Sequence, residues 1–312
     1  MARNQFSQAH FHDEEAARKW FEAARWPEGP VCPHCGGLKH YATKKAGRYR
    51  CAAKECRKDF TVMTGSVMER SHAPLTQWAV AFQMAASSKK GFSAHQLHRQ
   101  LGCQYNTAWF LHHRVMEAMR RGGLEPPLGQ GSGVVEADET YFGNVPEAKR
   151  PIKTTRGRAF TKGGRTGPSG KRAIVALVER GGEVRSFHVA VATQDTIENI
   201  IKKNVARETT LYTDESRLYH GSLLHVSEHE TVKHSVGEYA RGNVHTNTIE
   251  GYFSIFKRGM KGVYQHCSEK NLHRYLAEFD FRYNTRKISD GERAVLAVKG
   301  GEGKRLTYRQ PN

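Results

Sequence analysis

Three acidic residues place the strongest constraint on how the chain can fold. Asp138 and Asp214 each close a short apolar, strand-like run, and Glu250 lies within an amphipathic helical pattern. Hard divalent cations such as Mg²⁺ are bound by carboxylate oxygens that converge from separate elements. A pair of such ions can hold both the attacking and the leaving oxygen of a phosphodiester. The three acids therefore predict a sheet and a helix that bring carboxylates together, with phosphoryl transfer on nucleic acid as the chemistry.

The charge balance favours the same class of partner. The 312 residues include 49 lysines and arginines against 31 acids, which gives a formal net charge of +18. An excess of this size attracts polyanions by releasing their counterions, although charge alone does not identify the polyanion. No apolar run approaches the ~20 residues of a membrane span, and the first residues lack the apolar core of a secretion signal. We therefore expect a cytoplasmic, nucleoid-associated protein with no membrane partner.

Four of the six cysteines form two closely spaced pairs. Cys32 and Cys35 flank a Pro-His turn, and Cys51 and Cys56 follow after an aromatic, basic stretch. In a reducing cytoplasm, cysteines are more often metal ligands than disulfides. Zinc takes four tetrahedral ligands, and two tight knuckles each supply half of the shell. We expect one structural Zn²⁺ in a zinc ribbon; the alternative is four ordinary buried thiols.

Two short helices are expected after the ribbon. Ser93 and Gln96 form a capping-box pattern that opens a helix ending at Gly102, and a second helix begins near Asn106. Two helices joined across a glycine fit a helix-turn-helix, whose second helix would enter the major groove of DNA. That helix carries three candidate DNA contacts, which are His112, His113 and Arg114. The alternative is an all-helical spacer.

Beyond a linker rich in glycine and proline, strand-like runs at 134–137, 173–178, 184–191 and 209–213 surround one helical segment. This order predicts a mixed α/β sheet of ribonuclease H type, in which the two aspartates lie side by side on neighbouring strands. The fold class is therefore a multidomain α+β or α/β protein. The expected parts are an N-terminal helix over 1–28, a zinc ribbon over 29–70, a helix-turn-helix region over 71–122, the linker over 123–133, a catalytic domain over 134–290 and a C-terminal tail over 291–312.

A basic insertion over residues 146–172 interrupts the catalytic region. From residue 149 to residue 172 the sequence holds nine lysines and arginines, five glycines and no acid, so this segment cannot bury a core. Uncompensated positive charges beside a metal site favour phosphate contacts; the alternative is a solvated loop. The residues expected to contact DNA here are Lys149, Arg150, Lys153, Arg156, Arg158, Lys162, Arg165, Lys171 and Arg172.

The helical pattern that begins at Asn247 has two distinct faces. Asn247, Glu250 and Lys257 fall on one face, whereas apolar residues fall on another that can be buried. Glu250 could complete the metal site, and Lys257 with Arg258 could grip a phosphate or a base of DNA. The alternative is that Glu250 and Lys257 both belong to an exposed, salt-bridged surface. His245, two residues before the helix, could contact DNA or the carboxylates.

Several longer motifs point to a family that the chain resembles. They are Arg25-Trp-Pro-Glu-Gly, Phe60-Thr-Val-Met-Thr-Gly, Glu136-Ala-Asp-Glu-Thr-Tyr-Phe-Gly143, His245-Thr-Asn-Thr-Ile-Glu-Gly251 and Phe279-Asp-Phe-Arg-Tyr-Asn284. This combination resembles the insertion-sequence transposases of the IS1595 group, whose catalytic part is termed ISXO2-like. The resemblance extends over nearly the whole chain.

The resemblance implies a DDE site in which Asp138 and Asp214 are the first two members. The third position of the family is an acid in some members and an asparagine in others, and a lysine follows it. Here both Asn247 and Glu250 precede Lys257. Carboxylate chemistry favours Glu250, with Asn247 as the alternative ligand.

The expected activity is cleavage at the ends of a mobile element and transfer of the cut strand to target DNA, with two Mg²⁺ or Mn²⁺ ions at the acids. The zinc ribbon and helix-turn-helix would bind the terminal inverted repeats in double-stranded DNA. At least a homodimer would hold two ends together. Two other functions stay open: a DNA-binding regulator without catalysis, and a ribonuclease H-type nuclease or resolvase that cuts without joining.

Overall fold

The computed structural model describes residues 5–143 and 170–307 and forms two compact units. Unit 1 comprises Met1–Arg121 together with Thr285–Asn312, and unit 2 comprises Gly122–Asn284. The chain therefore enters unit 2 at the start of the segment rich in glycine and proline, and it returns to unit 1 for its last residues.

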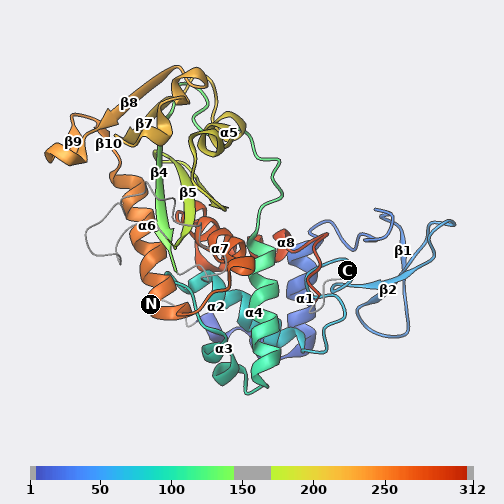
Figure 1. The fold of residues 1–312 in the computed structure, drawn as a ribbon. Helices are drawn as coiled ribbons and strands as arrows, with labels where there is room; N and C mark the ends of the chain where they lie inside the picture. The colour runs from blue at the N-terminus through green and yellow to red at the C-terminus, as the bar shows by residue number, and fades with distance from the viewer. Residues whose placement is uncertain (1–4, 144–169, 308–312) are drawn as a thin grey trace. The chain divides into compact units, whose positions relative to one another are not determined.

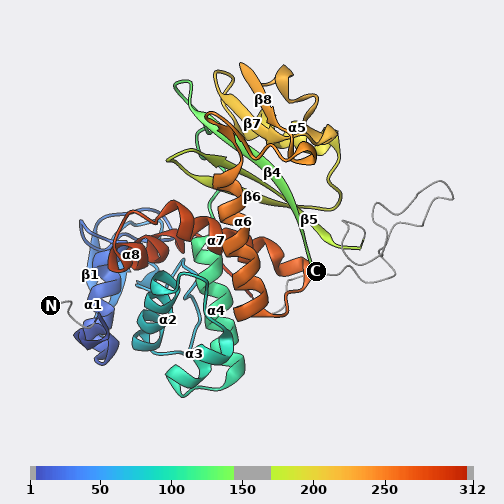
Figure 2. The same cartoon turned by 90° about the vertical axis from the view of Figure 1, so that its left-hand side faces the viewer.

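Unit 1 is built mainly from helices (Figures 1 and 2). They are α1 (Glu14–Arg25), α2 (Leu75–Ser87), α3 (Ala94–Leu101), α4 (Tyr105–Met119) and α8 (Asp290–Gly300), with 3₁₀ turns at Gln5–Ser7 and Ala9–Phe11. Side chains cap the first turns of α1 and α3: Asp13 accepts from the Ala16 N–H at 2.7 Å, and Ser93 accepts from the Gln96 N–H at 3.1 Å. The helices bury a common set of large apolar side chains, which includes Phe21, Trp78, Phe82, Leu97, Leu111 and Met116.

A three-stranded antiparallel sheet also belongs to unit 1. Its strands, in spatial order, are β1 (His40–Ala42), β2 (Arg48–Cys51) and β3 (Asp59–Thr61). Trp26 packs edge-on against Tyr49 and Phe60, with ring centroids 6.2 and 5.8 Å apart. Because side chains alternate along β2, Arg48 and Arg50 fall on the opposite face, where both are exposed.

The prediction of a C-terminal tail over 291–312 is wrong for residues 291–300, which belong to helix α8. Helix α8 begins with a capping box between Ser289 and Glu292, and it packs against α1, α2 and α4. Ala294, Ala297 and Val298 are buried in this contact. These three small apolar residues have helical spacing, and the capping box before them is a helix start signal. The prediction of a tail did not take this signal into account.

The predicted DNA contacts on α4 are contradicted by their burial. His112, His113 and Arg114 are only 2%, 1% and 5% exposed. The His112 ring packs edge-on against Phe92 at 4.7 Å between centroids, and Arg114 donates to the Glu69 carbonyl at 3.0 Å. These polar side chains are used inside unit 1, so they do not offer a surface to a phosphate.

Unit 2 contains a five-stranded mixed sheet with the order β6-β5-β4-β7-β8. The strands are β4 (Val134–Phe142), β5 (Arg172–Glu179), β6 (Val184–Val189), β7 (Thr210–Asp214) and β8 (Glu228–Val232). β4, β5 and β6 form an antiparallel meander, whereas β7 runs parallel to β4 and β8 runs parallel to β7. The prediction of a mixed α/β sheet is confirmed; β8, whose residues are largely polar, is an addition to it.

Helices cover both faces of this sheet (Figures 1 and 2). They are α5 (Gln194–Asn204), α6 (Asn247–Gly259) and α7 (Leu272–Asn284), with a π-helical turn at Met260–Tyr264, a hairpin of β9 (Ala240–Arg241) and β10 (Val244–His245), and 3₁₀ turns at Arg217–Tyr219, Ser222–Leu224, His234–Val236 and Glu269–Asn271. Val135 and Ala137 of β4 share a buried cluster with Ile197 and Ile201 of α5. The alternate residues of β4 therefore point to the other face, where α6 packs on β4 and β5, and α7 on β6.

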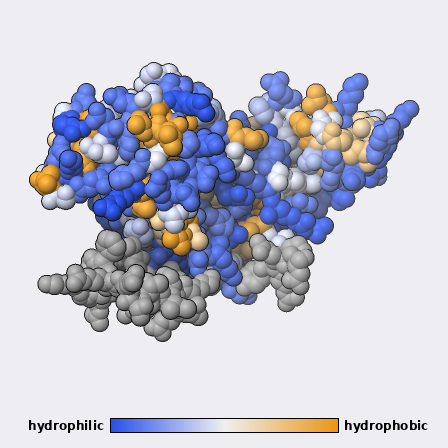
Figure 3. All heavy atoms as spheres, turned by 45° about the horizontal axis from the view of Figure 1, so that its top comes forward, coloured by the Kyte–Doolittle hydropathy of each residue, from blue (hydrophilic) through white to orange (hydrophobic). Residues whose placement is uncertain are grey.

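Figure 3 shows one face, on which apolar residues form separate groups among hydrophilic ones. No helix within residues 5–143 and 170–307 is both long and apolar enough to cross a membrane.

Candidate active site

Asp138 and Asp214 lie on neighbouring strands of the unit 2 sheet. β4 and β7 are parallel, and their register pairs Glu136 with Tyr212. Because side chains alternate along a strand, the residues two positions further on, Asp138 and Asp214, fall on the same face as that pair. This is the face on which α6 packs. The two aspartates thus lie on one face of adjacent strands. Asp214 ends β7, whereas Asp138 lies in the middle of β4, because this strand continues to Phe142 beyond the predicted range of 134–137.

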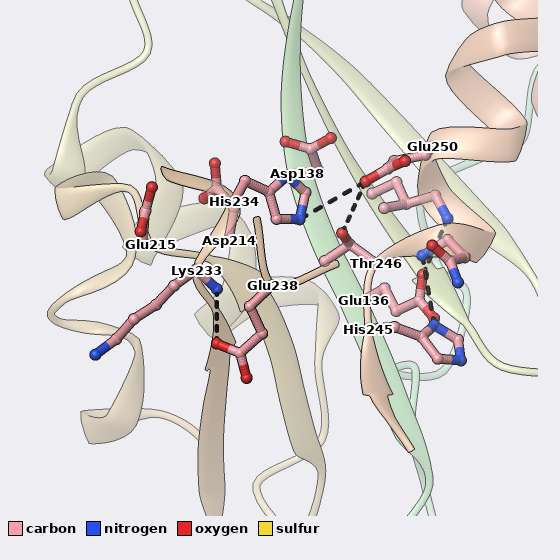
Figure 4. Close-up of polar contacts among 12 residues, drawn as sticks. Glu136, Asp138, Asp214, Glu215, Lys233, His234, Glu238, His245, Thr246 and Glu250 are labelled. Atoms are coloured by element: carbon pink, nitrogen blue, oxygen red, sulfur yellow. Dashed lines mark hydrogen bonds and ion pairs between the residues drawn. The ribbon is translucent and has the colours of Figure 1, made fainter. Parts of the chain in front are cut away.

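Glu250 comes to this face from the first turn of α6. Its Oε1 accepts a hydrogen bond from Thr246 Oγ1 at 3.1 Å and lies 3.9 Å from His234 Nε2. Figure 4 shows the His234 ring pointing toward Glu250, with Asp138 and Asp214 close by. The negative charge of Glu250 also contributes to raising the pKa of Asp138. The structure therefore brings all three predicted acids to one place.

Burial and nearby negative charges disfavour the ionised forms of Asp138 and Asp214. Desolvation raises the pKa of Asp138 well above its ordinary value, and the negative charges of Glu139 and Asp214 raise it further. Desolvation also raises the pKa of Asp214, although the Ser216 N–H, which donates to its Oδ1 at 3.0 Å, acts in the opposite direction. A bound divalent cation would lower the pKa values of these carboxyl groups, because its positive charge stabilises their ionised forms.

The three carboxylates are spaced more widely than a closed metal cage. Within the described parts of the chain, the four zinc-ribbon cysteines are the only group of three or more candidate ligands whose donor atoms all lie within 4.8 Å of one another. A cation shared by Asp138, Asp214 and Glu250 would therefore require their side chains to move closer. Glu250 is 47% exposed at its side chain, so it has room for such a movement.

The other predicted site residues of α6 are Asn247, Lys257 and Arg258. Asn247 is the first residue of the helix and is exposed, with its backbone N–H 3.4 Å from His245 Nδ1. Lys257 lies in the last turn. Arg258 donates to the Ser254 hydroxyl at 2.8 Å, one turn back along the helix.

The predicted DNA contacts of the basic insertion are only partly described. Lys149, Arg150, Lys153, Arg156, Arg158, Lys162 and Arg165 lie outside the described residues. Lys171 and Arg172, which are described, precede and begin β5. Arg172 donates to the Cys267 carbonyl at 2.9 Å, so this guanidinium already serves a contact within the unit.

The sequence did not predict a role for Glu136, which lies two positions before Asp138 on the same face of β4. Its side chain is fully buried. One oxygen accepts from the backbone N–H groups of Thr248 and Ile249 at 2.9 and 3.0 Å, and the other accepts from the Thr248 hydroxyl at 2.8 Å. These N–H groups belong to the first turn of α6, where Thr246 provides no side-chain cap. Glu136 therefore caps the helix that carries Glu250.

Arg180, in the turn between β5 and β6, is the partner of Glu136. Its Nε donates to Glu136 Oε1 at 2.7 Å, and its two terminal nitrogens donate to the carbonyls of Asn243 and His245 at 2.6 and 2.9 Å. The guanidinium also lies over the Tyr212 ring, 4.7 Å from its centroid. His245 Nδ1 lies 3.5 Å from Glu136 Oε1, so this histidine faces the helix cap. The sequence signal for this cluster was weak, because it consists of an acid in a strand and an arginine in a turn.

Glu139 provides a fourth carboxylate beside the site. It accepts a hydrogen bond from the buried Tyr219 hydroxyl at 2.8 Å. Desolvation raises its pKa, while the Tyr219 bond lowers it. Because Glu139 follows Asp138 in the strand, it points to the α5 face, where Tyr219 belongs to the core.

The four cysteines of the ribbon form a site that fits zinc. Their Sγ atoms all lie within 4.8 Å of one another, with Cys32 and Cys56 3.7 Å apart and Cys35 and Cys51 3.5 Å apart. A tetrahedral ion with Zn–S bonds of about 2.3 Å separates its sulfurs by about 3.8 Å. The donor set and its spacing match one structural zinc ion.

The first prediction concerns this zinc site. Cys35→Ser should lower the zinc content from about one ion per chain to near zero, because loss of one thiolate opens the tetrahedral shell. Loss of the metal should also expose β1–β3 to proteolysis, since small zinc modules fold only with their ion. Atomic absorption and limited proteolysis measure the two effects. Cys103→Ser, a thiol outside the cluster, should retain zinc; equal zinc in both variants would contradict the assignment.

The second prediction concerns the raised pKa of Asp138. A carboxyl whose pKa is raised by folding stabilises the protein only while it is protonated, and this contribution is lost as pH rises through the folded-state pKa. Asp138→Asn should therefore raise the melting temperature in Mg²⁺-free buffer by a few degrees at pH 8 and change it little at pH 4.

Thermal denaturation at the two pH values is the measurement, with Glu208→Gln as the control. Glu208 is an exposed acid outside the site, so its substitution should have the same small effect at both pH values. A gain for Asp138→Asn at pH 4 that equals the gain at pH 8 would contradict the electrostatic account.

Comparisons with known proteins place the zinc-ribbon region and the region that carries the three acids in one family. Residues 12–59 match the transposase zinc-ribbon domain, and residues 130–284 match the ISXO2-like transposase domain, both in their IS1595 forms. The chain is also 29% identical over 280 residues to a Halobacterium salinarum protein described as an uncharacterized protein in transposable element ISH50, with 87% of this chain and 91% of that protein covered.

The two family matches follow each other in the order expected from the sequence motifs, and together they cover well over half of the chain. The second match contains every carboxylate of the site, and the first contains the four cysteines. Such a domain pair indicates an enzyme that acts on nucleic acid. The chain therefore belongs to the IS1595 family of insertion-sequence transposases.

Proposed function

We propose that this protein is a DDE transposase in which Asp138, Asp214 and Glu250 hold two Mg²⁺ or Mn²⁺ ions. The observation that carries this proposal is the meeting of the three carboxylates on the α6 face of the sheet, where burial and the charges of Asp214 and Glu250 contribute to raising the pKa of Asp138. A site that accumulates negative charge in a partly desolvated position is suited to divalent cations.

The chemistry proposed is hydrolysis of a phosphodiester at the end of an insertion sequence, followed by attack of the freed 3′ hydroxyl on target DNA. Bound metal ions would stabilise the attacking and leaving oxygens. The protein would contribute position: the neighbouring strands β4 and β7 fix the two aspartates, and the first turn of α6 fixes Glu250. Lys257, two turns further along α6, and Arg258 would contact phosphates of the bound strand.

The topology of unit 2 supports a ribonuclease H-like domain. A three-stranded antiparallel meander is followed by helix α5 and by two strands that run parallel to β4. The first two acids lie on the central strand and on its parallel neighbour, which is the arrangement expected for that fold.

Unit 1 would bind the terminal inverted repeats of the element. α3 and α4 are joined across Gly102, which adopts a left-handed conformation with φ of 61°, as a helix-turn-helix requires. Because His112, His113 and Arg114 are buried, a recognition helix would instead use the exposed start of α4, residues 104–106. Transposition needs two ends to be held together, so we propose a homodimer or higher oligomer on DNA.

The open face of the ribbon offers a second DNA contact. Arg48 and Arg50 both donate from Nε to Asp59, at 3.0 and 2.7 Å. Each guanidinium has five N–H donors, so Asp59 can orient both while donors are left for phosphate. Lys44 and Lys45 in the adjoining turn are also exposed.

Two alternatives would use the same features differently. A DNA-binding regulator would need the ribbon and helices but not the three acids. A ribonuclease H-type nuclease or resolvase would use the acids to cut without joining ends. The convergence of the three carboxylates favours catalysis over the regulator, and a joined product distinguishes a transposase from a nuclease.

The third prediction identifies the third metal ligand. Glu250→Gln should lower Mg²⁺-dependent cleavage of DNA carrying the element ends by about 10²–10³-fold, because it removes a charge at the reacting centre. Asn247→Ala should reduce cleavage much less, since Asn247 lies at the exposed start of the helix. Gel analysis of cleaved and joined products measures both; the reverse order of effects would assign the role to Asn247.

The fourth prediction tests the ribbon surface by salt dependence. Arg48→Gln/Arg50→Gln should reduce the slope of log affinity against log salt concentration by about 1.8, since each lost phosphate contact lowers it by about 0.9. Fluorescence anisotropy with element-end DNA measures this slope. Lys202→Gln/Lys203→Gln removes the same charge from exposed positions at the end of α5; an equal change in this control would show that only net charge matters.

A further inference from the structure

The buried Glu136 carboxylate connects two elements that carry acids. It belongs to β4, two positions before Asp138, and it accepts from Thr248 and Ile249 at the start of α6. Glu250 follows two residues after Thr248. The cap therefore sets the distance between the strand that carries the first acid and the helix turn that carries the third.

Arg180 contacts two further elements around the site, β7 and β10. Its guanidinium lies over Tyr212, two positions before Asp214 in β7. Its hydrogen bonds to the Asn243 and His245 carbonyls hold β10, the strand that leads into α6. One ion pair thus contacts β4, β7, β10 and α6.

The contacts follow a regular pattern relative to the acids. Glu136 and Tyr212 are paired across the parallel strands. Each lies two residues before an aspartate, so its side chain is on the same face of the sheet as that aspartate. Thr248 lies two positions before Glu250 along the chain. Figure 4 shows Glu136 and His245 together near the start of α6, with Glu250 further along the helix. A displacement of the ion pair between Glu136 and Arg180 would therefore move all three acids.

We infer that Glu136 and Arg180 form a positioning clamp that holds Asp138, Asp214 and Glu250 in the arrangement that binds divalent cations. This inference rests on the proposed function of the three acids. Neither clamp residue is a metal ligand here, because Glu136 is engaged by the first turn of α6 and by Arg180. Groups that orient metal ligands without touching the ion commonly change metal affinity by 10–100-fold when they are replaced.

The competing explanation is a buried ion pair that only stabilises the unit. The protein contains a matched control for this possibility. Glu278 of α7 is also fully buried, pairs with Arg282 and accepts from Tyr264, in the turn that follows the C-terminal end of α6. It therefore supports the same helix at the end remote from Glu250. A purely structural role would make the two glutamates equivalent.

The deciding experiment titrates Mn²⁺ into the zinc-loaded full-length protein by isothermal titration calorimetry. Glu136→Gln, which keeps the shape of the side chain, should weaken Mn²⁺ binding by about 10–100-fold, whereas Glu278→Gln should bind Mn²⁺ as the wild type does. Circular dichroism and zinc content check that both variants are folded. Wild-type affinity in Glu136→Gln, or an equal loss in both variants, would overturn the clamp.

A milder pair of variants tests the same link without removing a buried charge. Thr248→Val deletes the hydroxyl that donates to Glu136, and Thr248→Ser restores it. Thr248→Val should weaken Mn²⁺ binding and increase the Mg²⁺ concentration needed for half-maximal cleavage, and Thr248→Ser should return both toward wild-type values. Identical behaviour of the two variants would contradict the clamp.

Failure of the clamp can be separated from failure of the proposed active site. Asp138→Asn should abolish the same Mn²⁺ signal. If Asp138→Asn binds Mn²⁺ like the wild type, the acids are not the metal site and the proposed function fails. If Asp138→Asn loses binding while Glu136→Gln retains it, the metal site stands and only the clamp is overturned.

Discussion

The arrangement of unit 2 depends on how the first turn of α6 is held. A helix start leaves several backbone N–H groups without a partner inside the helix, and here Glu136 from a neighbouring strand accepts from two of them. The carboxylate also favours the positive end of the helix dipole. Arg180 balances the charge of this buried acid. Because the capped turn carries Glu250, a contact that stabilises the helix also places an acid opposite Asp138.

The placement of the aspartates could be predicted because it follows from local patterns. Asp138 and Asp214 each end an apolar run, and parallel pairing of two such runs brings their ends together. The four cysteines could likewise be predicted as a cluster, since their spacing encodes two knuckles. The family membership expected from the motifs is confirmed, whereas the roles of individual acids remain predictions.

The parts that could not be predicted depend on contacts between distant residues. The bond between Glu136 and Thr248 joins positions 112 apart, and neither residue has a local signature of its role. His112, His113 and Arg114 look like an exposed basic face, yet they lie inside unit 1, where aromatic rings and a carbonyl accommodate their polar groups. The segment after Ser289 joins the unit 1 core through small residues that carry little hydrophobic signal.

We propose that Asp138, Asp214 and Glu250 together hold the catalytic cations. Anomalous diffraction from a crystal of the protein with Mn²⁺ and a DNA end tests it most directly, because it locates each ion independently of activity. We expect Mn²⁺ peaks within about 2.2 Å of carboxylate oxygens from these three residues. Mn²⁺ bound elsewhere in the protein, or at the two aspartates with Asn247 in place of Glu250, would contradict it.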